Sequence, residues 1–331
     1  MFNVDIAIKF GSNEIIIYQK GVGIIAKEPA FLAVEEEGKR LKVKATGKRA
    51  EKMFLSGSSN LSVYQPIENS EIVNKKLAII LMKQVLDQAV VHDLKFSKLN
   101  ALVAVPCALN KSQLDEIKDV LQSSGVSSVT FVQNSVCVRE MLEMEDNEYV
   151  AVVDIGKYIT DISVLNQYDF NTGRMYLLGG ADMDKSITTF IEDNHNLLVS
   201  DLTSQAVKNE IASLYDRDLY KTEYIGIDAD NKYERHDISA SEVKVAISNV
   251  YDAIFGFVKE MVEKLPKEIA ANVHKNGVVL VGGASVISGL YEYAKKRLDM
   301  PVTIPEEPAD AVIIGAGKLL SCEHEFITIK W

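Results

Sequence analysis

Two short segments of the sequence each place a glycine turn between two apolar strands, about 145 residues apart. The first is Ile8–Gly11 followed by Ile15–Ile17, and the second is Val153–Gly156 followed by Ile162–Val164. A tight turn of this kind can point successive backbone N–H groups at a phosphate, and glycine lets the ligand approach the backbone closely. The segments therefore indicate a duplicated lobe with one phosphate-binding turn from each half facing a shared cleft.

Asp154, at the end of the second strand, could hold Mg²⁺ through water. The alternatives are two unrelated hairpins and an aspartate that only caps a turn.

Two further strands end in a pair of glycines. The apolar strand Val278–Val281 runs into Gly282, Gly283 and Ala284, where small residues would let the flat ring of adenine lie close to the backbone. Leu178 runs into Gly179 and Gly180 ahead of a predicted helix, whose N-terminus favours anionic phosphate. Either pair alone would also suit a simple strand-to-helix reversal.

The chain alternates β-branched runs with helical patterns, which is typical of an α/β fold. We predict strands at 4–10, 14–18, 31–35, 41–46, 101–105, 129–132, 150–154, 161–166, 174–178, 278–281 and 302–304. Helices are predicted at 71–89, 112–123, 182–195, 203–215, 241–263, 289–298 and 310–320. The stretch 216–238, rich in Asp, Tyr, Lys and Asn, is predicted to be an exposed hairpin or loop.

Length and composition indicate two core-forming lobes and exclude some function classes. The 331 residues exceed the roughly 100–200 of a usual single domain, and 47% hydrophobic with 25% charged residues is ordinary for a globular protein. The formal charge of −11 comes without a long basic run, which argues against non-specific nucleic-acid binding. An anion site in such a chain has to rely on local backbone geometry.

Cysteine and histidine usage gives no metal motif. The 3 cysteines are far apart and are interpreted as free thiols of a reducing cytoplasm. The 5 histidines have no spaced partner and are interpreted as ordinary surface or core residues. The first residues lack the pattern of a signal peptide, and no apolar run approaches the ~18 residues of a membrane span. We expect a cytoplasmic protein, at most peripheral to a membrane.

Taken in order, several segments resemble the bacterial actin MreB family, and the resemblance runs through nearly the whole chain. These segments are 15–29, Val105-Pro106, 150–161, Gly179-Gly180 with Met183-Asp184, Asn196–Leu198 and 278–319. The resemblance is to a divergent member, similar to the paralogues of wall-less helical bacteria such as spiroplasmas. It implies an actin-like fold of the actin, Hsp70 and sugar-kinase superfamily, with two lobes that each hold a central mixed sheet flanked by helices.

The resemblance also implies four subdomains around a nucleotide cleft. Their expected bounds are 1–30, 64–147 and 320–331 for subdomain IA, 31–63 for IB, 148–180 and 245–319 for IIA, and 181–244 for IIB. ATP or ADP with Mg²⁺ would occupy the cleft, and the subunits would assemble into protofilaments, usually paired antiparallel on the inner membrane face.

Site residues follow from the resemblance position by position. The first phosphate loop would contain Gly11, Ser12 and Asn13, with Lys9 just before it. The second would contain Asp154 as the metal ligand, Gly156 and Lys157, with Gly179 and Gly180 alongside. Ribose and base would be contacted by Lys208 and by Gln205 or Glu210, and adenosine by Gly282, Gly283 and Ala284.

The chain departs from the family at three places. Lys9 stands where the family has Asp, Gln133-Asn134-Ser135 where it has Glu-Glu-Pro, and Lys157-Tyr158-Ile159 where it has Gly-Gly-Thr. The catalytic candidates are therefore Asn134, whose amide cannot take a proton from water, and Thr160. Loss of general-base assistance worth roughly 10²–10⁴-fold predicts slow or impaired hydrolysis. Lys9 would contact phosphate, or alternatively would pair with Asp154 and block the site.

The predicted function is that of a cytoskeletal filament subunit that binds ATP, is at most a weak ATPase, and acts in cell shape or in helicity and motility. The alternatives are a sugar or acid kinase of the same superfamily and a chaperone-type ATPase. Expected partners are further copies of the chain, MreB-like paralogues and the membrane inner face. Leu94 and Phe96 are the candidates for shallow membrane insertion, unless they pack into the core.

Overall fold

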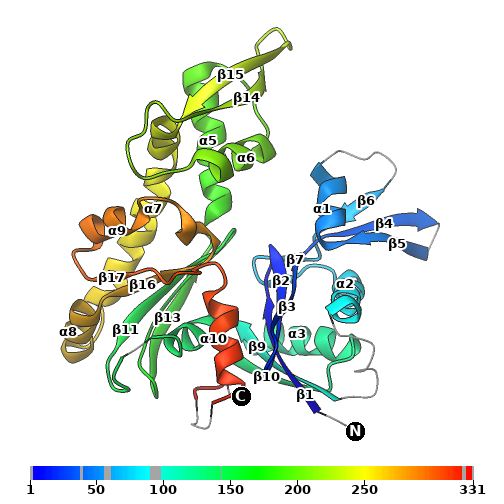
Figure 1. Ribbon diagram of the computed structural model, residues 1–331, viewed down its shortest axis with the longest axis vertical. Helices are drawn as coiled ribbons and strands as arrows, with labels where there is room; N and C mark the ends of the chain where they lie inside the picture. The colour runs from blue at the N-terminus through cyan, green and yellow to red at the C-terminus, as the bar shows by residue number, and fades with distance from the viewer. Residues whose placement is uncertain are drawn as a thin grey trace. The chain divides into compact units, whose positions relative to one another are not determined.

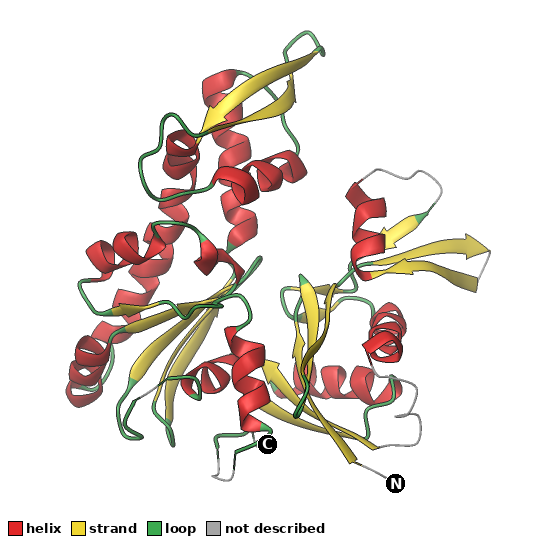
Figure 2. Cartoon of the chain, viewed as in Figure 1, coloured by secondary structure: helices red, strands yellow, loops and turns green. Residues whose placement is uncertain are grey.

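A computed structural model describes residues 3–37, 40–55, 61–89, 98–142, 144–322 and 326–329. Strands and helices alternate along this part of the chain, as the sequence patterns predict for an α/β fold (Figures 1 and 2). The chain divides into two compact units, 1–147 with 165–175 and 310–331, and 148–164 with 176–309. Each unit has its own hydrophobic core. The finer division into four subdomains stays a prediction.

The main sheet of the first unit has the strand order β10-β9-β1-β2-β3. β1 is antiparallel to β2 and parallel to β9, which is parallel to β10. Side chains of α2 and α3 pack with β1 and β9 in one core. α4 and α10 pack against each other, α10 also packs against β1, and α4 packs against β9 and β10. The bounds are β1 (Asn3–Phe10), β2 (Glu14–Gln19), β3 (Gly23–Pro29), α2 (Lys75–Ala89), β9 (Lys98–Val105), α3 (Lys111–Ser123), β10 (Ser128–Gln133), α4 (Asn134–Arg139) and α10 (Ala311–Leu319).

A smaller sheet in the same unit has the order β5-β4-β6 and carries one helix. Ala50 and Met53 of that helix, α1, pack on Ala33 and Ala45. On the strands' other face Leu32 and Val34 pack with Leu77 of α2. A two-stranded ribbon, β7 with β8, follows. The bounds are β4 (Leu32–Glu37), β5 (Arg40–Thr46), α1 (Gly47–Leu55), β6 (Ser62–Tyr64), β7 (Ile67–Glu68) and β8 (Glu71–Ile72).

The second main sheet has the order β13-β12-β11-β16-β17. Every residue of β11 and β12 is buried, because both faces of these strands are covered. The elements are β11 (Val150–Ile155), β12 (Thr160–Leu165), β13 (Phe170–Tyr176), α5 (Gly180–His195), α6 (Asp201–Ile211), α7 (Ala240–Glu263), α8 (Lys267–Asn276), β16 (Val278–Val281), the 3₁₀ turn η2 (Gly283–Val286), α9 (Leu290–Leu298) and β17 (Val302–Thr303). A hairpin, β14 (Lys221–Ile227) with β15 (Tyr233–Ser239), stands beside α6.

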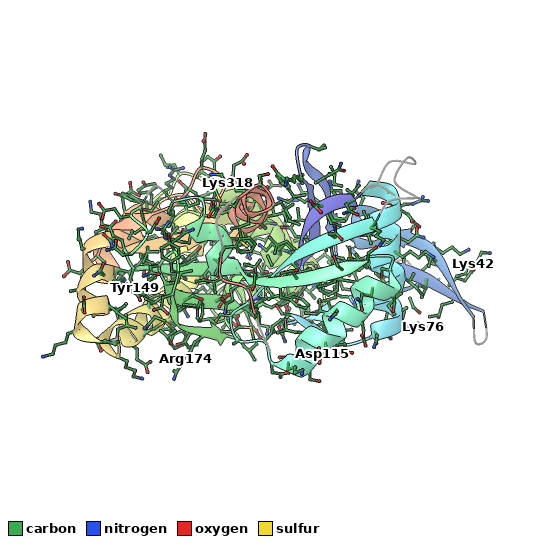
Figure 3. All side chains as sticks on the ribbon, turned by 90° about the horizontal axis from the view of Figure 1, so that it is seen from below. Lys42, Lys76, Asp115, Tyr149, Arg174 and Lys318 are labelled. Carbon is green, nitrogen blue, oxygen red and sulfur yellow. The ribbon has the colours of Figure 1, made fainter. Side chains whose placement is uncertain are left out.

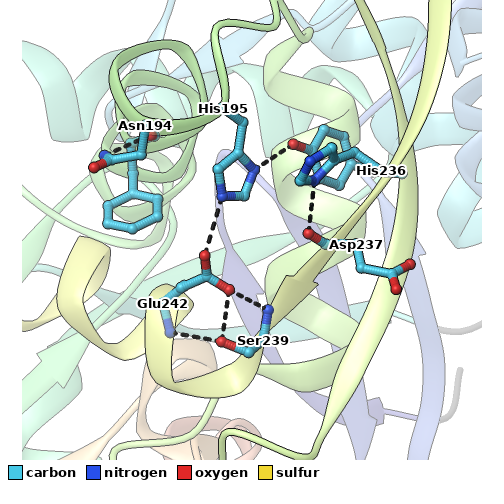
Figure 4. A network of polar contacts seen from close by, with 8 residues as sticks. Asn194, His195, His236, Asp237, Ser239 and Glu242 are labelled. Carbon is cyan, nitrogen blue, oxygen red and sulfur yellow. Dashed lines mark hydrogen bonds and ion pairs between the residues drawn. The ribbon is translucent and has the colours of Figure 1, made fainter.

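A buried histidine ties this hairpin to two helices (Figure 4). His195, the last residue of α5, has Nδ1 2.6 Å from the Tyr224 hydroxyl and Nε2 3.0 Å from Glu242. Burial raises the pKa of Tyr224 to about 12, so its hydroxyl stays protonated and can donate to Nδ1, leaving Nε2–H for the carboxylate. Glu242 in turn accepts from the backbone N–H of Ser239 and so caps α7. His195 is thus a structural residue whose partners are distant in sequence, which fits its interpretation as an ordinary surface or core residue.

Most predicted elements are present within a few residues of their predicted bounds. β3, α1, α4, α8 and the short strands β6, β7 and β8 were not predicted. α4 has only 6 residues, too few to show helical periodicity, and α8 lies between Pro266 and Gly277 in a stretch of mixed polarity. β6, β7 and β8 have only 2 or 3 residues each, and β8 takes the place of the first residues of the helix predicted at 71–89. The stretch 216–238 forms the β14–β15 hairpin and the loop before it. Among the described residues, the helices are all too short or too polar to cross a bilayer.

Gly315 provides a test of the contact between α10 and α4. A Cβ there would overlap the backbone carbonyl of Cys137, whereas a Cβ at Gly256, exposed in the middle of α7, meets no heavy atom within 4 Å. We expect Gly315→Ala to lower the free energy of unfolding by at least about 2 kcal/mol, since the obstacle is backbone. Gly256→Ala, the control, should raise it by about 0.5–1 kcal/mol. Urea unfolding followed by circular dichroism measures both, and equal effects would contradict the close contact.

Candidate functional site

The turn between β11 and β12 is the centre of the candidate site in the second unit. Gly156 N–H donates to the Ile159 carbonyl at 2.9 Å, which closes the turn over Lys157 and Tyr158. A Cβ at Gly156 would lie 3.0 Å from that carbonyl oxygen. Gly156 does not have a positive φ. Glycine is therefore needed here for space and not for backbone conformation.

The N-terminus of α5 packs directly on this turn. Gly180 N–H donates to the Gly156 carbonyl at 2.9 Å, and Ala181 N–H donates to the Lys157 carbonyl at 2.7 Å. A Cβ at Gly179 would lie 2.6 Å from the Gly156 oxygen, so only glycine permits this contact. The first amides of α5 are thus bonded to protein carbonyls. The helix can act on an anion mainly through its dipole, and less through free N–H groups than the sequence alone indicated.

A buried ion pair joins α5 to α6 at the same place. Lys208 Nζ lies 2.6 Å from Asp184 Oδ1 and donates to the Gly180 carbonyl at 2.6 Å. The two side chains are only 12% and 6% exposed. Burial lowers the pKa of Lys208 and raises the pKa of Asp184, while the opposite charge of each partner counteracts the shift. The pair fixes α6 against the N-terminal turn of α5.

The sequence analysis named Asp184 only as part of the family resemblance and gave it no role. Its position beside Met183, on the apolar face of α5, was a usable signal, because a buried carboxylate in a helix needs a charged or hydrogen-bonding partner. The other two α6 candidates lie differently. Gln205 is half-buried, and Glu210 is exposed and accepts a hydrogen bond from Thr222 Oγ1 of β14 at 2.7 Å.

Asp154 and Gly282 are in contact between β11 and the end of β16. Asp154 is 7% exposed, and a Cβ at Gly282 would overlap its Oδ1. Gly282 has φ +92°, a conformation that glycine tolerates, and its N–H donates to the Pro308 carbonyl at 2.7 Å. Gly283 is exposed with open space around it, and Ala284 accepts from the buried Tyr251 hydroxyl at 2.7 Å.

Thr160, one of the two catalytic candidates, lies fully buried in β12. Its hydroxyl donates to the Leu178 carbonyl at 2.7 Å, just before the Gly179-Gly180 pair. The hydroxyl proton is therefore used to hold the segment between β13 and α5. A structural role accounts for Thr160 in this arrangement.

The turn between β1 and β2 is the corresponding feature of the first unit. Gly11 N–H donates to the Glu14 carbonyl at 3.2 Å, and a Cβ at Gly11 would lie 2.8 Å from that oxygen. Ser12 is buried: its Oγ accepts from Ser70 N–H at 2.8 Å, and its carbonyl accepts from Gln65 Nε2. Asn13 is exposed, and its carbonyl accepts from Ala30 N–H at 3.0 Å. Contacts from the 65–70 segment thus hold the turn in place.

Lys9 and Asn134 lie in neighbouring parts of this unit. Lys9 is half-buried in β1, between Ile16 and Ala104 on the adjacent strands. Asn134 is buried at the start of α4, directly after β10. Burial strongly raises the pKa of Cys137 in α4, and the charge of Lys9 opposes that shift in part.

Two predicted site residues, Leu94 and Phe96, lie outside the described residues. The roles assigned to the other site residues stay predictions. Among the described residues, no group of three or more His, Cys, Asp or Glu side chains could hold a metal ion by itself.

Comparison with known proteins identifies the family. The family described as MreB/Mbl protein matches residues 3–328. The cell shape-determining protein Mbl of Bacillus subtilis (strain 168) is 27% identical over 324 residues, covering 97% of this chain and 96% of the relative. The cell shape-determining protein MreB of Escherichia coli (strain K12) is 25% identical over 328 residues, covering 97% and 94%.

Solved structures with the same fold are more distant in sequence. MreB5 of Spiroplasma citri bound to ADP has a TM-score of 0.87 at 21% identity and covers 96% of each chain. The MamK double helical filament has a TM-score of 0.80 at 19% identity, covering 96% of this chain and 99% of that chain. Because the family match spans nearly all of the chain and these structures share its two-lobed, actin-like fold, this protein belongs to the MreB/Mbl family.

Proposed function

We propose that this chain is the subunit of a cytoskeletal, actin-like filament that determines cell shape and binds ATP or ADP. The observation that carries the proposal is the convergence of four distant segments in the second unit. The β11–β12 turn, the N-terminus of α5, Lys208 of α6 and Gly282 after β16 all meet near Asp154 or Gly156. The relatives named as cell shape-determining proteins support the cellular role. They also disfavour the alternative of a small-molecule kinase.

Nucleotide binding is proposed from the site and from the structural neighbours. MreB5 of Spiroplasma citri is bound to ADP in one structure and to AMPPNP in another. In this chain, the turn at Gly156 and Lys157 would bind phosphate through the backbone N–H of Lys157, because the Gly156 N–H donates to the Ile159 carbonyl. Lys208 would reach the ribose or base, and the open space at Gly283 would accept the adenosine. The first unit would contribute Gly11, Ser12, Asn13 and Lys9 to phosphate binding.

Mg²⁺ is proposed as the accompanying ion, with Asp154 as its protein ligand. Mg²⁺ is typically held by one or two carboxylates together with waters and substrate phosphates. A single carboxylate fits this pattern, and the missing Cβ at Gly282 leaves the room that Asp154 Oδ1 requires. The ion would neutralise phosphate charge when bound.

Hydrolysis is proposed to be slow. Asn134 offers an amide where the family has a carboxylate, so it can orient a water but cannot accept its proton. Antiparallel pairing of protofilaments, assembly with MreB-like paralogues, contact with the inner membrane face and a role in helicity or motility are further proposals from the family resemblance.

Sedimentation combined with phosphate release tests the filament proposal. The purified protein would be centrifuged with ATP, with AMPPNP and without nucleotide, while phosphate is measured in the same samples. We expect pelleting with nucleotide and a phosphate release rate well below one per minute, because base assistance is missing. Rapid turnover of a small molecule without pelleting would instead support the kinase alternative.

The metal role of Asp154 is tested with the isosteric variant Asp154→Asn. Removing the charge should abolish the Mg²⁺-dependent part of nucleotide affinity, by about tenfold or more, while Mg²⁺-free binding changes little. Titration of a fluorescent ATP analogue with and without Mg²⁺ measures both parts. Asp169→Asn, a change in the first unit, serves as the control, and an unaltered Mg²⁺ effect in Asp154→Asn would remove the proposed role.

Restoring a general base tests the explanation for slow hydrolysis. Asn134→Glu together with Ile159→Thr should raise the rate of phosphate release at least about tenfold, because the new carboxylate can accept a proton from the attacking water. Asn134→Gln with Ile159→Thr is the matched control, since Gln has the length of Glu without its basicity. If both double variants release phosphate at the wild-type rate, Lys9 or the shape of the second loop limits hydrolysis instead.

A further inference from the structure

A loop in the second unit presents apolar side chains to solvent. All six residues from Tyr215 to Tyr220 are exposed. Leu219 is 99% exposed and Tyr220 is 57% exposed. The guanidinium of Arg217 lies 5.5 Å from the centroid of the Tyr215 ring. Tyr and Arg are enriched among the residues that carry most of the binding energy of protein interfaces, and apolar side chains exposed together mark interaction sites.

This loop is held in one conformation by contacts at its base and along its length. Leu214 N–H donates to the Ser288 carbonyl at 2.7 Å, and Arg217 N–H donates to Ser241 Oγ at 2.8 Å. Asp216 pairs with Lys244 of α7 at 2.7 Å. A loop that is already ordered loses little conformational freedom when it binds, so its exposed leucine can contribute fully to an interface.

The first unit holds a pocket of suitable size and chemistry. Its volume is about 450 Å³, within the range of roughly 300–1,000 Å³ typical of ligand pockets. Aromatic and aliphatic side chains form most of its wall: Phe31, Phe54, Tyr64, Val73 and Leu77. Phe54 and Val73 are about half exposed at this wall, and Glu68 is the charged residue in it. The pocket therefore suits an apolar group accompanied by a cation.

The charges around loop and pocket are complementary at two levels. Arg217 lies two residues before Leu219. Its positive charge would be attracted to Glu68 in the pocket wall. α1, which contributes Phe54 to the pocket wall, carries the exposed cations Lys48, Arg49 and Lys52, and β5 carries the exposed Lys42, which Figure 3 labels. The loop carries Asp216 and Asp218 on either side of Arg217. Because Asp216 is paired with Lys244, Asp218 is the loop carboxylate that these cations can attract.

We propose that the 215–220 loop of one copy of the chain docks into this pocket of a second copy, with Leu219 among the aromatic rings and Arg217 paired with Glu68. The loop and the pocket are different surfaces of the same chain. A copy that has accepted a loop in its pocket therefore still exposes its own loop to a further copy. Such a heterologous contact either closes into a ring or continues into a filament. The inference rests on the proposed filament function, to which it adds a specific contact between copies.

Sedimentation of charge-reversal and truncation variants tests the contact. Leu219→Ser and Arg217→Glu should each raise the critical concentration for pelleting about tenfold, and Arg217→Glu with Glu68→Arg should restore it to near the wild-type value. Leu198→Ser, at another exposed leucine of the same unit, is the control and should pellet like wild type. Circular dichroism melts establish that each variant is folded. If Leu219→Ser pellets like Leu198→Ser, or the double reversal does not recover, the contact is refuted.

Cross-linking between two single variants tests the contact between loop and pocket without relying on pelleting. Copies with Leu219→Cys are mixed with copies carrying Val73→Cys and treated with a short bis-maleimide; a cross-linked dimer beyond that of either variant alone is expected. Leu198→Cys mixed with Val73→Cys should give only the background from the native cysteines. Absence of the specific dimer overturns the docking. If wild type fails to pellet but the dimer forms, the filament proposal fails while the contact stands.

Discussion

The structure of the candidate site depends on the direct packing of the α5 N-terminus against the β11–β12 turn. Two backbone hydrogen bonds, from Gly180 to the Gly156 carbonyl and from Ala181 to the Lys157 carbonyl, hold helix and turn together. The contact needs glycine at 179, because any Cβ would meet the turn's backbone. The positions of the other site residues in the second unit depend on this close approach of α5 to the β11–β12 turn.

Lys208 shows how a third element joins this contact. Its ammonium group binds both the Gly180 carbonyl and the buried carboxylate of Asp184, so α6 is fixed to the same helical turn. Breaking such a pair by removing one partner would leave an uncompensated buried charge. Lys208, which is predicted to contact the nucleotide, therefore also holds α6 against α5 beside the β11–β12 turn. Any substitution of Lys208 would change both the predicted nucleotide contact and this packing.

The first unit links its glycine turn to a distant part of its surface. Ser12 accepts hydrogen bonds from Ser70 and from Gln65, and Gln65 also lines the apolar pocket beside α1. A copy of the chain seated in that pocket would thus contact the segment that holds the predicted phosphate loop. The same few residues connect the two activities proposed for this protein, nucleotide binding and contact between copies.

The sequence by itself determined the α/β class, the positions of most strands and helices, and the glycine turns at Gly11 and Gly156, because these depend on local periodicity and on residues that allow close approach. It also marked Asn134 as a departure from the family. Only the tertiary structure decided that the first amides of α5 are already bonded, that Thr160 holds Leu178, and that His195 joins Tyr224 to Glu242. Each of these contacts joins residues from different elements, and their pairing depends on how the elements pack, which no local pattern encodes.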